Sequence, residues 1–198
     1  MAERDFYTRY PRPVLWLVPA GEGIAPFYVS TLPVTNEQFE AFDPGFERSP
    51  AASGDRDPAL GVSWENAAGY CAWYAEIARK AIRLPDETEW EHACRAGTAG
   101  RAFWGDDPEA ADRLAWHAGN SDPDRVPPLD AKPSNPFGLF AMLGGVWEWT
   151  ASADGEARIL RGGCWRLPPA ELTCALRRAE LPARHLPDAG FRIARSLR

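Results

Sequence analysis

Apolar positions recur at helical spacing in the segment that follows Ser63. The spacing continues to about Lys80 and predicts the longest helix of the chain over 64–80. Ser63 comes just before the first apolar position and is the expected N-cap. The buried stripe of this helix is expected to contain Trp64, Ala67, Ala68, Cys71, Tyr74, Ala75 and Ala78. Cys71 is therefore interpreted as a small core residue.

Two shorter helices are indicated by capping-box patterns. Thr35 is followed three residues later by Gln38, which predicts a helix that runs to about Phe42. Asp86 followed by Glu89 predicts another helix start, and Gly97 is expected to end that helix. The acidic residues of this first turn interact favourably with the helix dipole and need no catalytic explanation.

Short apolar runs flanked by Pro and Gly predict strands. These runs are 14–18, 27–29, 159–160 and 191–194. The segment 43–57 is rich in Pro, Gly, Ser and charged residues, and a mobile surface loop is expected there. The segment 100–135 has many turn residues and no periodic pattern, so it is expected to be irregular, with Trp104 and Trp116 as anchors.

Composition narrows the class of protein. A chain of 198 residues can bury one sizeable core, so a single domain over 1–198 is predicted. Nine Trp, nineteen Pro and seventeen Gly indicate an irregular α+β protein with little regular secondary structure. No signal-peptide pattern and no run long enough to cross a membrane is found, so we expect a soluble cytoplasmic protein without a membrane partner.

Charge is distributed unevenly along the chain. The net charge is −6, yet nine Arg and only three acidic residues lie between Arg158 and Arg198. One interpretation is that basic C-terminal strands pair with an acidic body. The other is a basic surface for an anionic ligand. Nucleic acid is not an expected partner, because the chain as a whole is acidic.

Six segments in the same order along the chain carry a family resemblance. They are Pro-Val-Thr-Asn-Glu-Gln-Phe (33–39), Gly-Val-Ser-Trp-Glu-Asn-Ala (61–67), Arg-Leu-Pro-Asp-Glu-Thr-Glu-Trp-Glu (83–91), Asn-Pro-Phe-Gly-Leu-Phe-Ala-Met-Leu-Gly-Gly-Val-Trp-Glu-Trp (135–149), Leu-Arg-Gly-Gly-Cys-Trp (160–165) and Gly-Phe-Arg (190–192). On these segments the sequence resembles the formylglycine-generating enzyme, or sulfatase-modifying factor, superfamily. The resemblance implies a C-type-lectin-like α+β fold with about three helices packed on small antiparallel sheets.

The resemblance also implies a test for catalysis. Oxidases of that family hold a copper ion with two cysteines, and the matching positions here are Leu167 and Leu172. Leucine neither ligates copper nor carries redox chemistry, so the family's oxidase mechanism is not expected. An alternative is an oxidase or sulfatase-modifying enzyme with an atypical metal or thiol site, for example one formed by Cys164 and Cys174.

Other metal sites are also not expected. Relatives often have Gly-Asn where this chain has Gly144-Gly145, which removes an oxygen from a calcium loop. Glu148 is expected to accept backbone hydrogen bonds instead. The loop with Asn120, Asp122 and Asp124 has a calcium-like composition but is interpreted as a turn. His92, His117 and His185 lack the close spacing of an iron site. We therefore predict no metal and no cofactor.

The segment between Trp165 and Asp188 mixes Arg, Leu and Pro in a way typical of recognition surfaces. In several relatives with this fold, including variable proteins of diversity-generating retroelements, the matching segment binds the ligand. We therefore predict a non-catalytic module that binds a protein or peptide. A variable protein diversified by such a retroelement is one form that this module could take. The alternative is that the Leu residues are core and the Arg residues solvate it. The predicted binding face consists of Trp165, Arg166, Leu167, Glu171, Leu172, Arg178, Arg184 and His185.

Overall fold

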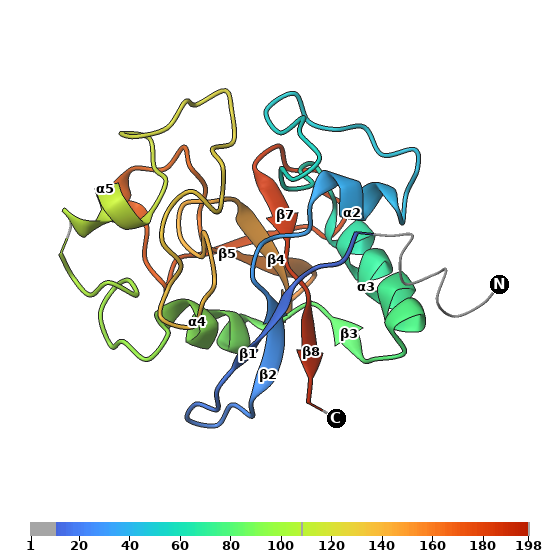
Figure 1. Cartoon of the computed structure of the whole chain (residues 1–198), viewed down its shortest axis with the longest axis horizontal. Coiled ribbons are helices and arrows are strands. Elements are labelled where there is room, and N and C mark those ends of the chain that lie inside the picture. The colour runs from blue at the N-terminus through green and yellow to red at the C-terminus, as the bar shows by residue number, and fades with distance from the viewer. Residues whose placement is uncertain (1–10, 108, 198) are drawn as a thin grey trace.

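The computed structural model describes residues 11–107 and 109–197, and two small sheets form its frame (Figure 1). The first sheet has the order β1-β2-β8-β3 and the second has the order β6-β5-β4-β7. The strands are β1 (Leu15–Val18), β2 (Phe27–Ser30), β3 (Ile82–Arg83), β4 (Trp147–Asp154), β5 (Ala157–Arg161), β6 (Arg177–Glu180), β7 (Ala189–Phe191) and β8 (Ala194–Ser196). Neighbouring strands are antiparallel except for β4 and β7, which are parallel.

Four α-helices lie within the described residues. They are α2 (Asn36–Glu40), α3 (Trp64–Ala78), α4 (Glu87–Arg95) and α5 (Ala110–Leu114), and a short 3₁₀ turn, η1, spans Pro169–Glu171. This mixture of helices and small sheets confirms the predicted α+β class. The three predicted helix starts are also confirmed, because Thr35, Ser63 and Asp86 each form a capping box. The short helix α5 was missed, because it lies in the segment without periodicity.

Helix α3 differs from its prediction in its inner face and its end. Tyr70, which was left out of the predicted stripe, is buried with Ala67 and Cys71, whereas Trp64 and Tyr74 are only half-buried. Tyr70 is buried because its ring packs against the rings of Phe39 and Phe191, which belong to other segments. The helix ends before Arg79, whose backbone is left-handed with φ of 50°.

The predicted strand 191–194 is two strands in different sheets. Strand β7 runs parallel to β4, and β8 pairs with β2 and β3. Between them the chain crosses from one sheet to the other at Arg192 and Ile193, which are both fully buried. Strands β4 and β6 were not predicted, because their segments read as an aromatic corner and as a recognition patch.

The core has two parts. One contains α3 and inner residues of β4, with Tyr70, Trp149 and Phe191 fully buried. The other lies between α4 and β2, with Trp90 and Phe27 fully buried. Within the described chain, no helix is both long and apolar enough to cross a membrane.

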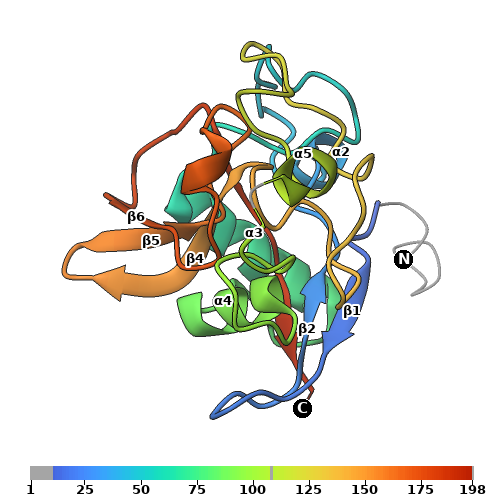
Figure 2. The same cartoon turned by 90° about the vertical axis from the view of Figure 1, so that its left-hand side faces the viewer.

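Long loops gather on the side of the molecule away from the C-terminus. Figures 1 and 2 show the loops after α2 and after α5 together there, above the sheets. The two loops are joined where Val126 N–H donates to the Ala51 carbonyl. The segment predicted as a mobile loop is fastened as well, because Asn36 Nδ2 donates to the carbonyls of Ala52 and Gly54. We call this side the loop face.

Candidate functional site

Two fully buried charged side chains of the described residues lie between the two sheets. Glu148 of β4 and Arg192 have no exposed surface. Arg192 Nε and Nη2 donate to the two Glu148 carboxylate oxygens over 2.6 and 2.7 Å, and Trp90 Nε1 donates to the same carboxylate over 2.6 Å. The expectation for Glu148 is therefore corrected in one respect. Its partners are side chains, and both of its carboxylate oxygens accept from the Arg192 guanidinium.

The second calcium-like loop is a turn, as expected. Asn120 Oδ1 accepts from His117 N–H, and its Nδ2 donates to the Ala115 carbonyl. Asp122 Oδ1 accepts from Asp124 N–H, which closes a small turn. These polar groups thus satisfy one another. Across the described part of the chain, no group of three or more His, Cys, Asp or Glu side chains could hold a metal ion.

Leu167 and Leu172 meet at Gly163. A Cβ added to Gly163 would lie 2.9 Å from Leu167 Cδ1 and 3.0 Å from both Leu172 Cδ2 and Leu176 Cδ2. Gly163 also has a left-handed backbone, with φ of 70°. We call Leu167, Leu172 and Leu176 the leucine cluster. Its side chains do not fit a copper ion, because hydrocarbon groups carry no lone pair for a metal.

The four cysteines do not pair in the way that the alternative enzyme hypothesis requires. Cys174 Sγ lies 2.9 Å from Cys94 Sγ, whereas Cys164 Sγ donates to Asp188 Oδ2 over 3.7 Å. All four thiols are free and buried. Burial raises the pKa of Cys164 to about 11 and that of Cys71 to about 12, so both are protonated near neutral pH. The hypothetical Cys164–Cys174 pair is not formed.

Two residues of the predicted binding face lie in the core. Trp165 has no exposed surface, and its Nε1 donates to the Asp122 carbonyl. Leu172 is 3% exposed and belongs to the leucine cluster. Their sequence neighbours Arg166 and Glu171 are exposed. The prediction placed Trp165 and Leu172 on the surface because composition does not show which side of an irregular segment faces inward.

The rest of the predicted face divides between segments. Leu167 is half-buried, and its carbonyl accepts from Ala118 N–H, close to where Arg166 Nε donates to the Pro123 carbonyl. Arg178 is on β6, where it pairs with Glu180. Arg184 and His185 are exposed in the next loop, and His185 Nδ1 donates to the Gly61 carbonyl over 2.6 Å. Arg166 and Leu167 therefore both lie against the segment 118–123, whereas His185 lies against Gly61 in a different part of the loop face.

His185 lines a hollow on the loop face, which we call the His185 groove. Its volume is about 520 Å³, within the usual range of ligand sites. The lining residues are Phe39, Asp43, Gly45, Phe46, Glu47, Arg48, Ser49, Pro50, Leu60, Gly61, Val62, Asn66, His185 and Pro187. Apart from His185, sequence reasoning missed these residues, although the segment 43–50 was recognised as a loop.

One wall of the His185 groove is fixed by Arg48. Its Nε and Nη2 donate to both carboxylate oxygens of Glu40, and its Nη1 lies 2.8 Å from Asp55 Oδ1. Hydrogen bonds from Arg48 lower the pKa of Glu40, so this carboxylate stays ionised at neutral pH. The groove therefore has one wall held by a charge-assisted bidentate contact and another held by the His185–Gly61 hydrogen bond.

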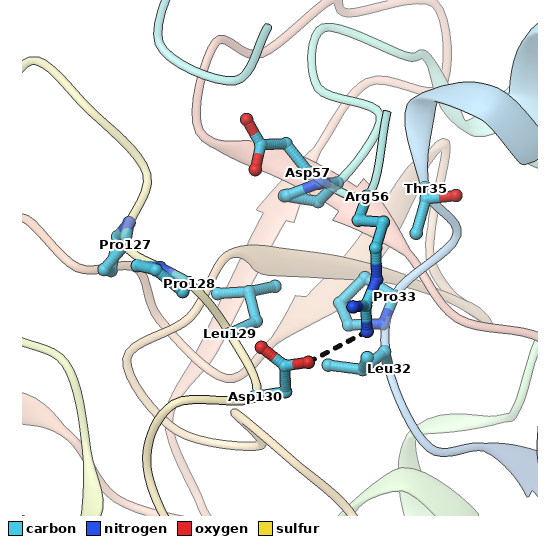
Figure 3. Close-up of a pocket in the computed structure, with 10 residues that line it drawn as sticks. Leu32, Pro33, Thr35, Arg56, Asp57, Pro127, Pro128, Leu129 and Asp130 are labelled. Carbon is cyan, nitrogen blue, oxygen red and sulfur yellow. Dashed lines mark hydrogen bonds and ion pairs between the residues drawn. The ribbon is translucent and has the colours of Figure 1, made fainter. Parts of the chain in front are cut away.

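A smaller pocket of about 230 Å³ lies between three loops of the same face. Figure 3 shows Leu32, Leu129 and prolines at its wall, with Arg56 reaching toward Asp130. Arg56 Nη2 lies 3.0 Å from Asp130 Oδ2 in an exposed ion pair. Such a pair is easily opened, because exposed ion pairs contribute little free energy. The only sequence signal for this pocket is the density of Pro in its loops.

Part of the basic C-terminal segment pairs with acidic residues of the body. Arg161 of β5 is buried and contacts Glu91 of α4. Arg177 of β6 pairs with Glu87 over 3.1 Å and with Asp154 over 3.0 Å. The first interpretation of the charge pattern is thereby confirmed for these residues. It leaves less free basic surface for an anionic ligand than the sequence alone indicates.

Comparison with known proteins identifies the family. The family model described as a sulfatase-modifying factor enzyme 1-like domain matches residues 18–197. The inactive C-alpha-formylglycine-generating enzyme 2 of Bos taurus is 38% identical over 139 residues, 61% of this chain. The formylglycine-generating enzyme of Mus musculus is 30% identical over 168 residues, 69% of this chain. The chain spans 44% of the length of each of these two relatives.

The fold of the chain is also that of solved structures. The variable protein 1 of Treponema denticola superposes with a TM-score of 0.76 at 20% identity, over 94% of this chain and 93% of the other. This likeness supports the predicted C-type-lectin-like architecture and, at such low identity, concerns the fold alone. The match to the family model extends over nearly all of the described residues. This chain belongs to the sulfatase-modifying factor enzyme 1-like family.

Proposed function

We propose that this chain is a non-catalytic binding module whose ligand is a protein or peptide. The observation that carries the proposal is the leucine cluster at Gly163, where the resemblance implies two copper-binding thiols. Leu167 and Leu172 fill this place with hydrocarbon, and Gly163 has no Cβ that would displace them. Similarity to a relative described as inactive supports the proposal, whereas similarity to an active enzyme makes a direct test necessary.

The His185 groove is the proposed ligand site. Phe39, Leu60 and Val62 supply an apolar floor, and polar groups lie on the walls. Both walls are held by hydrogen bonds to neighbouring segments, so a ligand would meet a largely formed site. Because Nδ1 of His185 is bonded to the Gly61 carbonyl, Nε2 is the ring nitrogen that would face a ligand.

Charge decides the kind of peptide that we propose. The groove contains the carboxylates of Asp43 and Glu47, and the positive charge of Arg48 is paired with Glu40 and Asp55. Complementarity then favours a peptide that presents an apolar side chain next to a basic one. A protein partner would present the same pair of side chains from an exposed loop.

Selection from a random peptide library displayed on phage tests this proposal. We expect peptides enriched on the immobilised chain to share an apolar residue beside Lys or Arg. Glu47→Ala and His185→Ala should weaken binding of a selected peptide about tenfold or more, as expected for a central contact. Glu156→Ala changes an exposed residue of the β4–β5 turn and is the matched control, with no expected effect. Enrichment insensitive to both groove substitutions would reject the groove.

The remaining exposed residues of the predicted face are tested by the same peptides. Arg166→Ala and Arg184→Ala separate the two walls of the loop face, because Arg166 contacts Pro123 and Arg184 precedes the groove residue His185. If only Arg166→Ala weakens binding, the ligand site lies beside Leu167. Oxidation of a cysteine-containing peptide in air by the copper-treated chain would overturn the non-catalytic proposal itself.

Diversification of this chain by a retroelement is a separate part of the proposal, which the genome sequence around its gene tests. The fold likeness to a protein named as variable supports it. A near-duplicate of the segment after Gly163, differing at adenines and next to a reverse transcriptase gene, is the expected sign. The cytoplasmic location also stays a prediction, which localisation of the tagged chain in its own cell would test.

A further inference from the structure

A pocket that the proposed function does not use lies on the loop face, beside the ion pair of Arg56 and Asp130 (Figure 3). We call it the Arg56 pocket. Residues of the segments 32–35, 56–58 and 127–130 line it, and among the described residues it shares none of them with the His185 groove. Its volume of about 230 Å³ is below the range of about 300–1,000 Å³ that is usual for sites of drug-sized ligands. The pocket therefore fits a small molecule rather than a folded partner.

The walls of the Arg56 pocket are apolar and largely fixed. Leu32, Leu129 and four prolines supply hydrocarbon surface around it. The φ angle of a proline is fixed by its ring, so these walls lose little freedom when a ligand binds. The Pro128 carbonyl also accepts from Ala131 N–H over 3.2 Å and from Trp116 Nε1 over 3.1 Å. An apolar group of a ligand would therefore enter a cavity that is already formed.

Charged side chains of both signs line the Arg56 pocket. Arg56 Nη2 lies 3.0 Å from Asp130 Oδ2, and the two side chains are 77% and 45% exposed. Because an exposed ion pair contributes little free energy, it can be exchanged for contacts with a ligand at small cost. Asp57 adds a second carboxylate, whose Oδ2 accepts from Gly54 N–H over 2.8 Å. With one guanidinium and two carboxylates, the described lining does not suit a ligand that is only an anion.

A ligand that replaces the ion pair has to satisfy both of its members. A carboxylate alone would pair with Arg56 and leave Asp130 without an opposite charge, and an amine alone would do the reverse. A ligand that carries both charges replaces both partners at once. The amine and the carboxylate of an α-amino acid are attached to the same carbon, so they are close enough together to meet two side chains that are themselves in contact.

We propose that the Arg56 pocket binds a free α-amino acid with an apolar side chain. The α-carboxylate would pair with the Arg56 guanidinium, whose planar donors match a carboxylate, and the α-ammonium would pair with Asp130. The side chain would lie against Leu32 and Leu129, which are on the wall beside this ion pair (Figure 3). Amino acids with charged side chains would be rejected, because the apolar wall offers no partner for a charge removed from water.

NMR titration of the isotopically labelled whole chain with L-leucine and L-phenylalanine tests the proposal. We expect saturable shifts of amide signals from the three lining segments, with one molecule bound per chain. N-acetyl-leucine lacks the ammonium group, leucinamide lacks the carboxylate, and glycine lacks the side chain. Each should bind about tenfold more weakly or worse, since each loses a charge-assisted contact or the apolar contact. Equal binding of leucine and any one of these three analogues would overturn the proposal, as would no saturable binding of either amino acid.

Substitutions that keep the size of each side chain locate the binding. Arg56→Gln and Asp130→Asn each remove one charge, and each should weaken leucine binding about tenfold. Both residues are exposed, so the fold should be unchanged, as their melting temperatures would show. Arg113→Gln and Glu156→Gln are the matched controls, because these residues are exposed and do not line the pocket. Binding that is unaffected by either Arg56→Gln or Asp130→Asn would reject recognition of both charges.

Discussion

Arg192 and Glu148 form a bidentate ion pair with no exposed surface on either side chain. The pair joins β4 to the residue at which the chain crosses between the two sheets. Arg192 Nη1 also donates to the Ser30 carbonyl of β2, so one guanidinium connects both sheets. Its hydrogen bonds compensate for the cost of removing two charges from water.

Replacing Arg192 should therefore destabilise the fold severely. Arg192→Leu leaves the Glu148 carboxylate buried without its partner, which costs about 3–5 kcal/mol. The free energy of unfolding, measured by urea denaturation followed by Trp fluorescence, should fall by this amount. Arg56→Ala removes the exposed pair with Asp130 and should change it by less than about 1 kcal/mol. Equal effects of the two substitutions would contradict the central role of Arg192.

Gly163 should tolerate no side chain. Gly163→Ala combines left-handed strain with contacts of 2.9–3.0 Å to the leucine cluster, and we expect a loss of about 2–4 kcal/mol. Gly155 has a similar φ of 59° but no atom within 4 Å of its added Cβ. Gly155→Ala should cost only about 1–2 kcal/mol. Thermal unfolding of both variants measures the two losses of stability. The loss in Gly155→Ala reports backbone strain alone, and the additional loss in Gly163→Ala reports crowding by the leucine cluster. Equal losses in the two variants would show that the leucine cluster moves to accept the added Cβ.

Thiols at the leucine cluster should create copper affinity. Because Leu167 and Leu172 approach the same point beside Gly163, Leu167→Cys/Leu172→Cys places two soft ligands close together. We expect this variant to bind one more equivalent of Cu(I) than the wild-type chain, as measured by competition with a chromophoric chelator. Leu167→Ser/Leu172→Ser is the matched control, since hydroxyls are poor ligands for Cu(I). Equally tight binding by the wild-type chain would favour the enzyme alternative.

Alkaline pH should weaken the fold through Cys164. Burial raises the pKa of its thiol to about 11 from an ordinary value of 9.0. The protonated thiol therefore stabilises the folded state below about pH 9, and this contribution is lost as the pH rises toward 11. Between pH 9 and 11 the free energy of unfolding should fall more in the wild-type chain than in Cys164→Ala, and the difference should reach up to about 3 kcal/mol. Urea denaturation across the window measures it, and identical pH slopes for both proteins would refute the assignment.

Local sequence determined the starts of the helices. Ser63 and Asn66, like Asp86 and Glu89, are three residues apart, so their reciprocal hydrogen bonds form within a single turn. Strands β1 and β2 were also predicted, because short apolar runs between Pro and Gly leave few other conformations. The prediction of a single domain over 1–198 stays a prediction.

Burial within irregular segments could not be predicted in the same way. Trp165 and Arg166 are neighbours in a segment without periodicity, yet one is buried and the other exposed. Their orientation depends on the Asp122 and Pro123 carbonyls, about forty residues earlier, which accept their hydrogen bonds. One wall of the His185 groove joins residues that are even farther apart, since His185 and Gly61 are separated by 124 residues.

The amino-acid sequence by itself determined the family, the helix starts and the absence of thiols at positions 167 and 172. Those properties depend on residue identity and on contacts within one turn. Only the tertiary structure decided that Arg192 occupies the Glu148 carboxylate, that Cys174 faces Cys94 and that Trp165 is core. Each of these properties depends on contacts between residues that are far apart in the chain. The packing of the two sheets and α4 fixes which side chains meet.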